Sequence, residues 1–304
     1  MNYIGSKKTL KDWIFSVIES KAKGEVFCDL FTGSCEIAKE AKKRGYYTIA
    51  NDLQYYSYIL AKYYLEENNL ITFPDITPIE GTITKLYSEN SLYFTKENAM
   101  LCDGFISYIK KNGENIPLLA MLINGMDEVA NTASVYGAYL KKYKKTALKP
   151  LVLKQEIIEG KIGKAFNKKA EELINEIEGD ILYLDPPYNS RQYSSNYHVL
   201  ETIAKMDEPE VHGKTLLRND CQKSNFCYKA KVKESLEYII SNAKFKYIFM
   251  SYNNEGIMSF EEIKDIFQKY GKYEIEQKEY KKFDSGSGVA KKNTIEYLHI
   301  LIKD

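Results

Sequence analysis

Four consecutive residues of this sequence have the chemical types and the spacing of a small catalytic turn. Asp185, Pro186, Pro187 and Tyr188 follow the apolar residues 181–184, which are typical of a buried strand. The prolines hold φ at about −65° and lack a backbone N–H, so the turn is stiff and its unused polar groups are acceptors. The Asp185 carboxylate and the Pro186 carbonyl can accept both N–H groups of an amino group on an aromatic base, and so favour the pyramidal geometry that frees the nitrogen lone pair. Tyr188 is then placed to stack on that base.

A second group of polar and small residues follows the predicted strand 26–30. Asp29, Gly33 and Ser34 surround a turn where the backbone can approach a ligand closely and the carboxylate can accept a hydrogen bond. Asp52 ends the next predicted strand, where an acid binds ribose hydroxyls in doubly wound sheets. The sequence has no G-x-G-x-x-G motif, so a ligand with a ribose and no phosphate, such as S-adenosylmethionine, fits better than a dinucleotide. The simpler alternative is that these acids only cap the helices that follow.

Alternating strands and helices at both ends of the chain would position these two groups. The N-terminal part has the order strand, helix, strand, helix, and the alternation resumes near residue 180 and ends in a predicted hairpin, strands 273–283 and 293–303. This order predicts an α/β fold with a doubly wound parallel sheet. Between the two parts, the alternation is lost. We therefore predict one catalytic domain formed by residues 1–70 and 179–304, with residues 71–178 inserted into it.

Positive charge is concentrated in part of this insertion. The chain has a formal net charge of only +1, but residues 138–169 carry ten lysines and two glutamates. The densest part of this segment consists of Lys141, Lys142, Lys144 and Lys145. Such a segment could follow the phosphates of a nucleic acid. On charge alone, a solvated lysine-rich face explains it equally well.

Cysteines, histidines and hydropathy narrow the class of protein further. The five cysteines form no CxxC pair and the chain has only three histidines, so we predict no metal site and expect free thiols. No run of about 18 apolar residues is present, and the N-terminal sequence has charge where a signal peptide is apolar. We therefore expect a cytoplasmic protein.

Five short motifs, taken in their order, resemble those of the Dam-type DNA adenine-N6 methyltransferases, the D12 class. They are YIGSKKTL, DLFTGS, AND, DPPY and FMSYNN, with the insertion before DPPY. The resemblance covers most of the chain. It implies a seven-stranded, Rossmann-like methyltransferase sheet with an antiparallel C-terminal strand. It also implies S-adenosylmethionine as methyl donor, S-adenosylhomocysteine as product, no metal, and a DNA target-recognition role for residues 71–178.

The same resemblance implies roles for individual residues. Asp185, Pro186, Pro187 and Tyr188 match the catalytic tetrapeptide without change. The residues implied to bind the cofactor are Tyr3, Ile4, Gly5, Lys7, Asp29, Phe31, Thr32, Gly33 and Asp52, and the turn chemistry adds Ser34. The segment from Tyr3 to Lys7 would lie against the methionine end of the cofactor, and Asp52 would bind its ribose. Cys35 departs from the family, which usually has a glycine here, and this leaves open how closely the backbone approaches the cofactor.

The resemblance also implies that double-stranded DNA is the partner. A base inside a duplex cannot reach such a pocket, so the target adenine would be flipped out of the stack. We expect DNA contacts from Arg191, Tyr193 and Tyr197, together with the lysines described above, and Phe283 as part of the wall of the base pocket. For Tyr197 and His198, a helix that packs on the sheet is an equally good interpretation.

We therefore predict a site-specific DNA methyltransferase that methylates adenine at N6, either in restriction-modification, with a cognate endonuclease as partner, or as an orphan enzyme. The alternatives are an RNA base methyltransferase, a protein glutamine methylase and a non-catalytic DNA-binding protein with the same fold. The YIGSK segment combined with the long insertion disfavours the first two. The intact quartet from Asp185 to Tyr188 disfavours the third.

Overall fold

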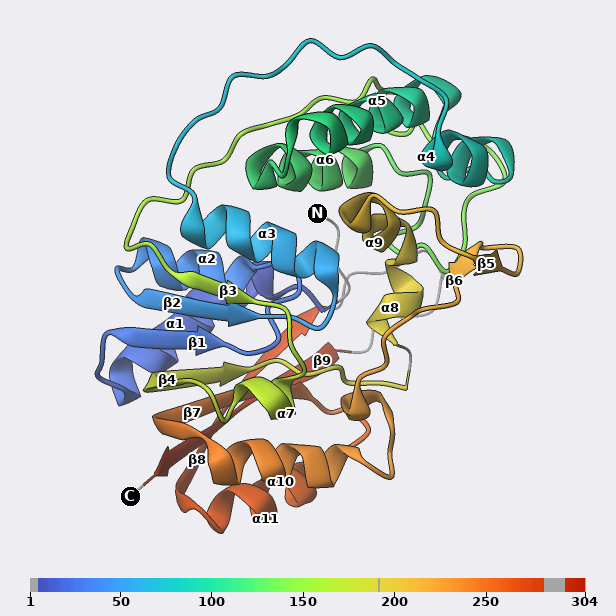
Figure 1. Ribbon diagram of the computed structural model, residues 1–304. Coiled ribbons are helices and arrows are strands. Elements are labelled where there is room, and N and C mark those ends of the chain that lie inside the picture. Colours follow the sequence, from blue (N-terminus) through green and yellow to red (C-terminus); the bar gives the residue numbers. More distant parts are fainter. Residues whose placement is uncertain (1–4, 191, 282–292, 304) are drawn as a thin grey trace.

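A seven-stranded mixed sheet forms the centre of the protein in the computed structural model, which describes residues 5–190, 192–281 and 293–303. The strand order is β3-β2-β1-β4-β7-β9-β8 (Figure 1). The strands are β1 (Val26–Asp29), β2 (Tyr47–Asn51), β3 (Lys164–Phe166), β4 (Glu178–Leu184), β7 (Lys244–Asn253), β8 (Gly271–Lys281) and β9 (Asn293–Lys303). Neighbouring strands are parallel except where β9 pairs with β7 and β8. The doubly wound sheet with an antiparallel C-terminal strand is thus confirmed.

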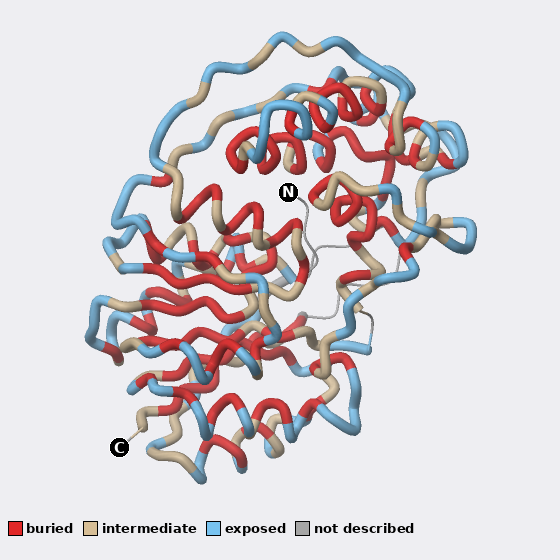
Figure 2. The backbone as a smooth tube through the Cα atoms, in the orientation of Figure 1, coloured by how far each residue is buried: buried red, intermediate tan, exposed pale blue. Residues whose placement is uncertain are grey.

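Helices cover both faces of this sheet. The helices η1 (Lys7–Thr9), α1 (Lys11–Lys21) and α2 (Glu36–Lys43) lie on one face, and α7 (Ala170–Leu173), α10 (Val232–Asn242) and α11 (Phe260–Gln268) lie on the other. Successive strand residues point to opposite faces, so Phe27 and Ile181 pack towards α1 and α2, whereas Cys28 and Leu182 pack towards α10 and α11. The inner strands β1, β2, β4, β7 and β9 are consequently buried along most of their length, whereas the edge strands β3 and β8 are more exposed (Figure 2).

A helical layer adjoins the sheet domain beyond β3. It contains α3 (Tyr55–Glu66), α4 (Thr82–Thr84), the π-helical turn η2 (Lys85–Glu89), α5 (Lys96–Asn112), α6 (Ile116–Glu128) and α9 (His198–Lys205) (Figure 1). The smaller elements α8 (Tyr193–Asn196), β5 (Val211–His212), β6 (Leu217–Arg218) and η3 (Asn225–Cys227) follow β4. Local signals define the longer helices: Thr95 caps the start of α5, and Gly113 ends it with a φ of 94°. Asn115 caps α6 with Pro117 in its first turn.

The predicted insertion, residues 71–178, includes part of the sheet domain. β3 pairs in parallel with β2 from Ile49 to Asn51, so residues 164–166 form an edge strand of the sheet. α7 then packs in the same apolar cluster as α10. This strand was not predicted, because it is only three residues long and only Ala165 is buried. The target-recognition role of residues 71–178 stays a prediction.

Within the helical layer, a glutamate of α9 caps the start of α3. Glu201 is 6% exposed, and its two carboxylate oxygens accept hydrogen bonds from the backbone N–H groups of Tyr55 (3.3 Å) and Tyr56 (3.1 Å). These groups begin α3, whose N-cap residue, Gln54, makes no side-chain cap. A residue far along the chain therefore caps the helix that follows β2, and so helps to fix the turn that contains Asp52.

Glu201→Ala should lower the free energy of unfolding by about 1–2 kcal/mol, because two N–H groups at the start of α3 lose their acceptors. Urea denaturation followed by circular dichroism measures this change. The exposed Glu208, in the loop after α9, is the matched control, and Glu208→Ala should change stability by less than about 0.5 kcal/mol. Equal effects of the two substitutions would contradict the capping role.

Candidate active site

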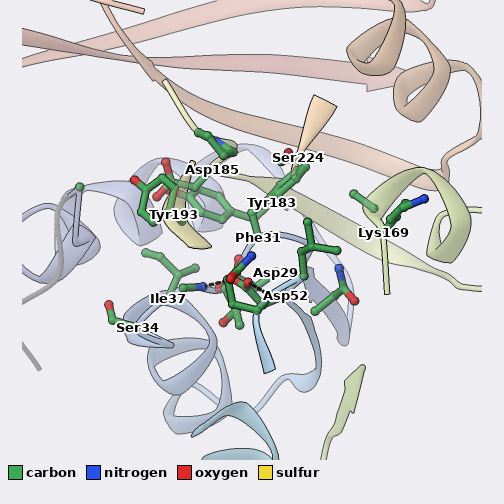
Figure 3. A pocket seen from close by; sticks show the side chains of 18 of the residues that line it. Asp29, Phe31, Ser34, Ile37, Asp52, Lys169, Tyr183, Asp185, Tyr193 and Ser224 are labelled. Carbon is green, nitrogen blue, oxygen red and sulfur yellow. Dashed lines mark hydrogen bonds between the residues drawn. The ribbon is translucent and has the colours of Figure 1, made fainter. Parts of the chain in front are cut away.

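A pocket lies at the carboxyl ends of three adjacent parallel strands. Asp29 ends β1, Asp52 follows β2 and Asp185 follows β4, and all three line the pocket (Figure 3). The parallel pairings of β1 with β2 and with β4 bring these strand ends to one edge of the sheet. Open α/β sheets bind their ligands at this edge. The two groups of residues that the sequence singled out therefore share one pocket.

Most of the predicted cofactor residues line this pocket. Those in the described part of the chain are Gly5, Lys7, Asp29, Phe31, Thr32, Gly33, Ser34 and Asp52. Tyr3 and Ile4 lie outside the described residues. Phe31 packs edge-on against Phe226 of η3, with ring centroids 5.0 Å apart, which ties the first turn to the segment after DPPY.

Asp52 shapes the turn after β1. Its Oδ2 accepts a hydrogen bond from the Gly33 N–H (2.8 Å) and its Oδ1 accepts one from the Gln54 N–H (2.8 Å). Burial raises the pKa of Asp52 to about 6, although both backbone bonds favour its charged form. Each oxygen can still accept a further hydrogen bond, so Asp52 both caps the turn and can bind ribose hydroxyls.

Cys35 has the backbone conformation of a glycine. Its φ of 62° and ψ of 16° lie in the left-handed region, and its thiol is fully buried. This explains why related sequences use glycine here. The backbone keeps the turn that glycine would make, while the side chain packs inward against the helical layer. The departure from the family motif therefore leaves the shape of the turn intact.

Asp29 is an acid without a counterion at the bottom of the pocket. It is 2% exposed, and its Oδ1 has no hydrogen-bond partner among the residues that the structure describes. Burial is the main cause that raises the pKa of Asp29 to about 8; the Thr32 side chain opposes this shift, and the nearby carboxylates of Asp185 and Asp52 add to it. The buried Thr32 hydroxyl beside it also lacks a partner within the described ranges. Together they can accept hydrogen bonds from a cationic ligand.

Asp185 lies in a buried network with an amine and a second acid. Lys7 Nζ is 3.0 Å from Asp185 Oδ1 and 3.1 Å from Glu296 Oε1 of β9. The Tyr188 hydroxyl contacts Lys7, donates to Asp185 and lies 3.1 Å from Glu296 Oε1. Burial raises the pKa of Asp185 to about 6, Lys7 opposes this shift, and Glu296 adds to it.

The other residues of the tetrapeptide differ in their access to the pocket. Pro187 lines it, whereas Pro186 is buried and is not part of the lining. Tyr188 is half-buried, points its hydroxyl into the Lys7 network, and packs edge-on against Tyr252, with ring centroids 5.1 Å apart. Tyr188 also does not line the pocket here, so its stacking on a base stays a prediction.

The aromatic residues after DPPY divide into two kinds. Tyr193 of α8 lines the pocket (Figure 3). Tyr197 is fully buried and packs against Tyr56, Tyr136 and Tyr193, so the prediction that it contacts DNA is wrong for this structure. The alternative interpretation was right that these residues belong to a buried helix, but α9, with the buried His198, packs against α3 and α6 and not on the sheet as expected.

The lysine segment also needs one correction. Lys141, Lys142 and Lys145 are exposed, but Lys144 is half-buried and its Nζ donates to the Thr132 carbonyl oxygen at 2.8 Å. Burial lowers the pKa of Lys144, which is consistent with a structural role. The segment follows Tyr136, whose N–H donates to the Asn196 carbonyl oxygen of α8 (2.8 Å). The exposed lysines are therefore close in sequence to a residue that contacts α8, the helix that carries the pocket residue Tyr193.

Several residues that line or adjoin the pocket were not predicted from the sequence as site residues. Lys168, Lys169 and Lys223 line the pocket but lie outside any motif, and Lys168 and Lys169 had been noted only as part of the basic segment. Glu296 could have been noticed, because it occupies the same face of β9 as the buried residues Leu298 and Ile300. Arg191 and Phe283, for which we predicted contacts, lie outside the described residues.

The pocket suits S-adenosylmethionine in its chemistry. Unpartnered acceptors at Asp29 and Thr32 match a ligand with an ammonium and a sulfonium group, and Asp52 has lone pairs for ribose hydroxyls. Within residues 5–190, 192–281 and 293–303, no group of three or more His, Cys, Asp or Glu side chains could hold a metal ion. In the same ranges, no helix has the length and apolar character needed to cross a membrane.

Comparisons with known proteins agree with this geometry. Residues 3–266 match the family model of the D12 class N6 adenine-specific DNA methyltransferases. The chain is 42% identical to the type II methyltransferase M.NlaIII of Neisseria lactamica, with 100% of this chain and 99% of that protein aligned. It is 36% identical to M.CviAII of Paramecium bursaria Chlorella virus 1, with 98% and 97% aligned. It is also 37% identical to M.FokI of Planomicrobium okeanokoites, of which it spans 53%.

The fold and the site define an enzyme that transfers a methyl group to DNA. The chain belongs to the D12 class of N6 adenine-specific DNA methyltransferases, and its methyl donor is S-adenosylmethionine.

Binding of S-adenosylmethionine at pH 7.5 should release a proton from Asp29. The raised pKa of Asp29, about 8, means that its carboxyl is largely protonated in the free protein at this pH, and a bound cation favours the carboxylate. Affinity should therefore rise as the pH increases towards 8. Titration calorimetry in two buffers with different ionisation enthalpies measures the number of protons released.

Asp29→Asn should abolish this proton release and weaken binding at least tenfold, because the buried acceptor loses its charge. Glu36→Gln is the matched control, since it removes another carboxylate from the pocket lining and should leave the proton release unchanged. If Asp29→Asn released as many protons as the unmodified protein, Asp29 would not be the residue that meets the cation.

Proposed function

We propose that this chain methylates N6 of a flipped-out adenine within a specific short sequence of duplex DNA, as the modification enzyme of a restriction-modification system. The main support for this proposal is that the Asp29–Asp52 turn and Asp185 line the same pocket. A cofactor bound at the turn would direct its methyl group towards the acid that can hold the amine.

The residues after β4 supply the acceptors for the target amine. Asp185 and the Pro186 carbonyl would accept the two N6 hydrogen atoms, which holds the nitrogen lone pair towards the pocket. When bound, S-adenosylmethionine supplies an activated methyl group. With its lone pair kept available by Asp185 and the Pro186 carbonyl, the amine would accept that methyl group, and one N6 proton would pass to an acceptor or to solvent. Asp185 acts in this way only when ionised and free of Lys7.

The duplex would lie across the pocket mouth and the helical layer. Flipping a base costs a few kcal/mol, which phosphate contacts and stacking must recover. Lys168, Lys169 and Lys223 at the pocket and the exposed Lys141, Lys142 and Lys145 can supply such contacts. The half-buried Tyr193 at the pocket wall is the aromatic residue placed to meet the base.

A restriction-modification role is proposed because of the relatives. M.NlaIII, M.CviAII and M.FokI are all described as type II methyltransferases. M.NlaIII aligns with this chain over nearly its whole length, so the same role fits the chain. A cognate endonuclease would then cleave the unmethylated form of the same sequence. An orphan enzyme is the alternative.

Transfer of labelled methyl groups to duplex DNA tests the proposal, with sequencing of the methylated adenines to identify the site. Asp185→Asn should reduce kcat at least 1000-fold, since an amide keeps the size but loses the charge that favours the attacking amine. The affinity for S-adenosylmethionine should change less than tenfold, because the cofactor contacts lie mainly at the Asp29–Asp52 turn.

Glu178→Gln is the matched control, since Glu178 is exposed at the opposite end of the same strand. It should leave transfer unchanged. Methylation of RNA or protein but not of DNA would contradict the proposed function. Methylation of adenines without any common sequence would contradict its specificity.

Replacing Lys141, Lys142 and Lys145 together with glutamine should weaken DNA binding and reduce the slope of log K against log salt by up to about three. Fluorescence anisotropy with a labelled duplex at several salt concentrations measures both. Lys144→Gln should instead lower thermal stability with little effect on the slope, because its Nζ binds the Thr132 carbonyl. An unchanged slope in the triple variant would mean that this segment is only a solvated face.

A further inference from the structure

Glu296 is a buried acid on a strand that otherwise packs in the apolar core. It lies on β9, opposite Asn253 of β7, and its side chain is fully buried. The same face of β9 carries Leu298 and Ile300, which are also fully buried. A carboxylate at such a position is costly unless it is paired, so its presence needs a reason other than packing.

The contacts of Glu296 all lead to Asp185. Its Oε1 is 3.1 Å from Lys7 Nζ and 3.1 Å from the Tyr188 hydroxyl. The same ammonium is 3.0 Å from Asp185 Oδ1, and the same hydroxyl donates to that oxygen. Two carboxylates therefore share one cation and one phenol. Glu296 does not itself line the pocket, whereas Lys7 and Asp185 do.

The second oxygen of Glu296 is unused. Oε2 is buried and has no hydrogen-bond partner in the part of the chain that the structure describes. It therefore offers Lys7 a second oxygen to bind on an acid that does not line the pocket. An ammonium that is held by Asp185 alone would compete with a substrate amine for the same acceptor, and it would have no nearby counterion to move to.

We propose that Glu296 is a positioning residue of the methyl transfer, which acts through Lys7 and Tyr188 to control the charge and the availability of Asp185. This inference rests on the proposed function and deepens it. In the free enzyme, Lys7 bridges the two acids. When the adenine amine binds Asp185, Lys7 shifts towards Glu296, which retains its charge partner and leaves Asp185 as an acceptor.

The charges around Asp185 determine how each substitution should act. Lys7 of η1, Glu296 of β9, Asp29 of β1 and three tyrosines face Asp185; the tyrosines are Tyr183 of β4, Tyr188 and Tyr193 of α8. Lys7 favours the ionised form of Asp185, and Glu296 and Asp29 disfavour it. Loss of the charge on Glu296 should therefore make Asp185 easier to ionise, and loss of Lys7 should make it harder.

The test is the pH dependence of kcat/KM for duplex DNA at saturating S-adenosylmethionine, which reports groups of the enzyme before DNA binds. Activity should fall as the pH decreases through the pKa of Asp185, about 6, because the protonated acid cannot accept the amine. Glu296→Gln should move this acid limb down by about one pH unit, and Lys7→Met should move it up by a similar amount. The double variant should lie between them.

The KM for duplex DNA provides a second readout. Glu296→Gln should raise KM for DNA several-fold at pH 8, where Asp185 is ionised in every form, because Lys7 then loses one of the two acids that hold it and binds Asp185 more firmly. Glu296→Asp keeps the charge and should restore the position of the limb. Glu276→Gln on the neighbouring strand β8 is the control and should leave both KM and the limb unchanged.

Three results would separate this inference from the function on which it rests. If Glu296→Gln lowered activity by the same factor at every pH and left the limb in place, Glu296 would be only structural. If Glu296→Gln did not fold, an unshifted limb in Lys7→Met would overturn the inference equally. If the unmodified enzyme did not methylate adenine in DNA at any pH, the proposed function itself would fail.

Discussion

The parallel pairing of β1 with β4 is the constraint on which the site depends. It places Asp29 beside Tyr183 in register and so brings the residue after Leu184 to the same edge of the sheet as the turn after β1. These segments are more than 150 residues apart in the sequence. Strands in parallel register end on the same side, so a cofactor turn and an amine acceptor become neighbours through backbone hydrogen bonds alone. The side chains then need only small adjustments.

The same edge collects three buried or half-buried carboxyl groups, of which Asp185 is paired with Lys7. Burial raises the pKa values of Asp29, Asp52 and Asp185, to about 8, 6 and 6. A raised pKa means that the folded state disfavours the carboxylate form. The free energy of unfolding therefore falls as the pH rises through the folded pKa of each acid, which for Asp29 is about 8. Such a cluster is stabilised by a cationic ligand. The protein is therefore arranged to be most stable with its cofactor bound.

The sequence was sufficient for the parts of the fold that have strong local patterns. The strands around Asp29, Asp52 and Asp185 were predicted because apolar runs end on acids followed by turn residues, and the C-terminal hairpin was predicted from two long alternating strands. β3 was missed because three residues carry no periodicity and its place is set by pairing with β2. The burial of Tyr197 and the half-burial of Lys144 likewise depend on residues distant in the sequence.

The network around Lys7 has a consequence for the order of folding. Lys7 begins η1, Asp185 follows the fourth strand, and Glu296 belongs to β9, which is last in the sequence and lies between β7 and β8. Until β9 pairs with β7, Lys7 therefore lacks one of the two acids that hold it, and the network that controls Asp185 is incomplete.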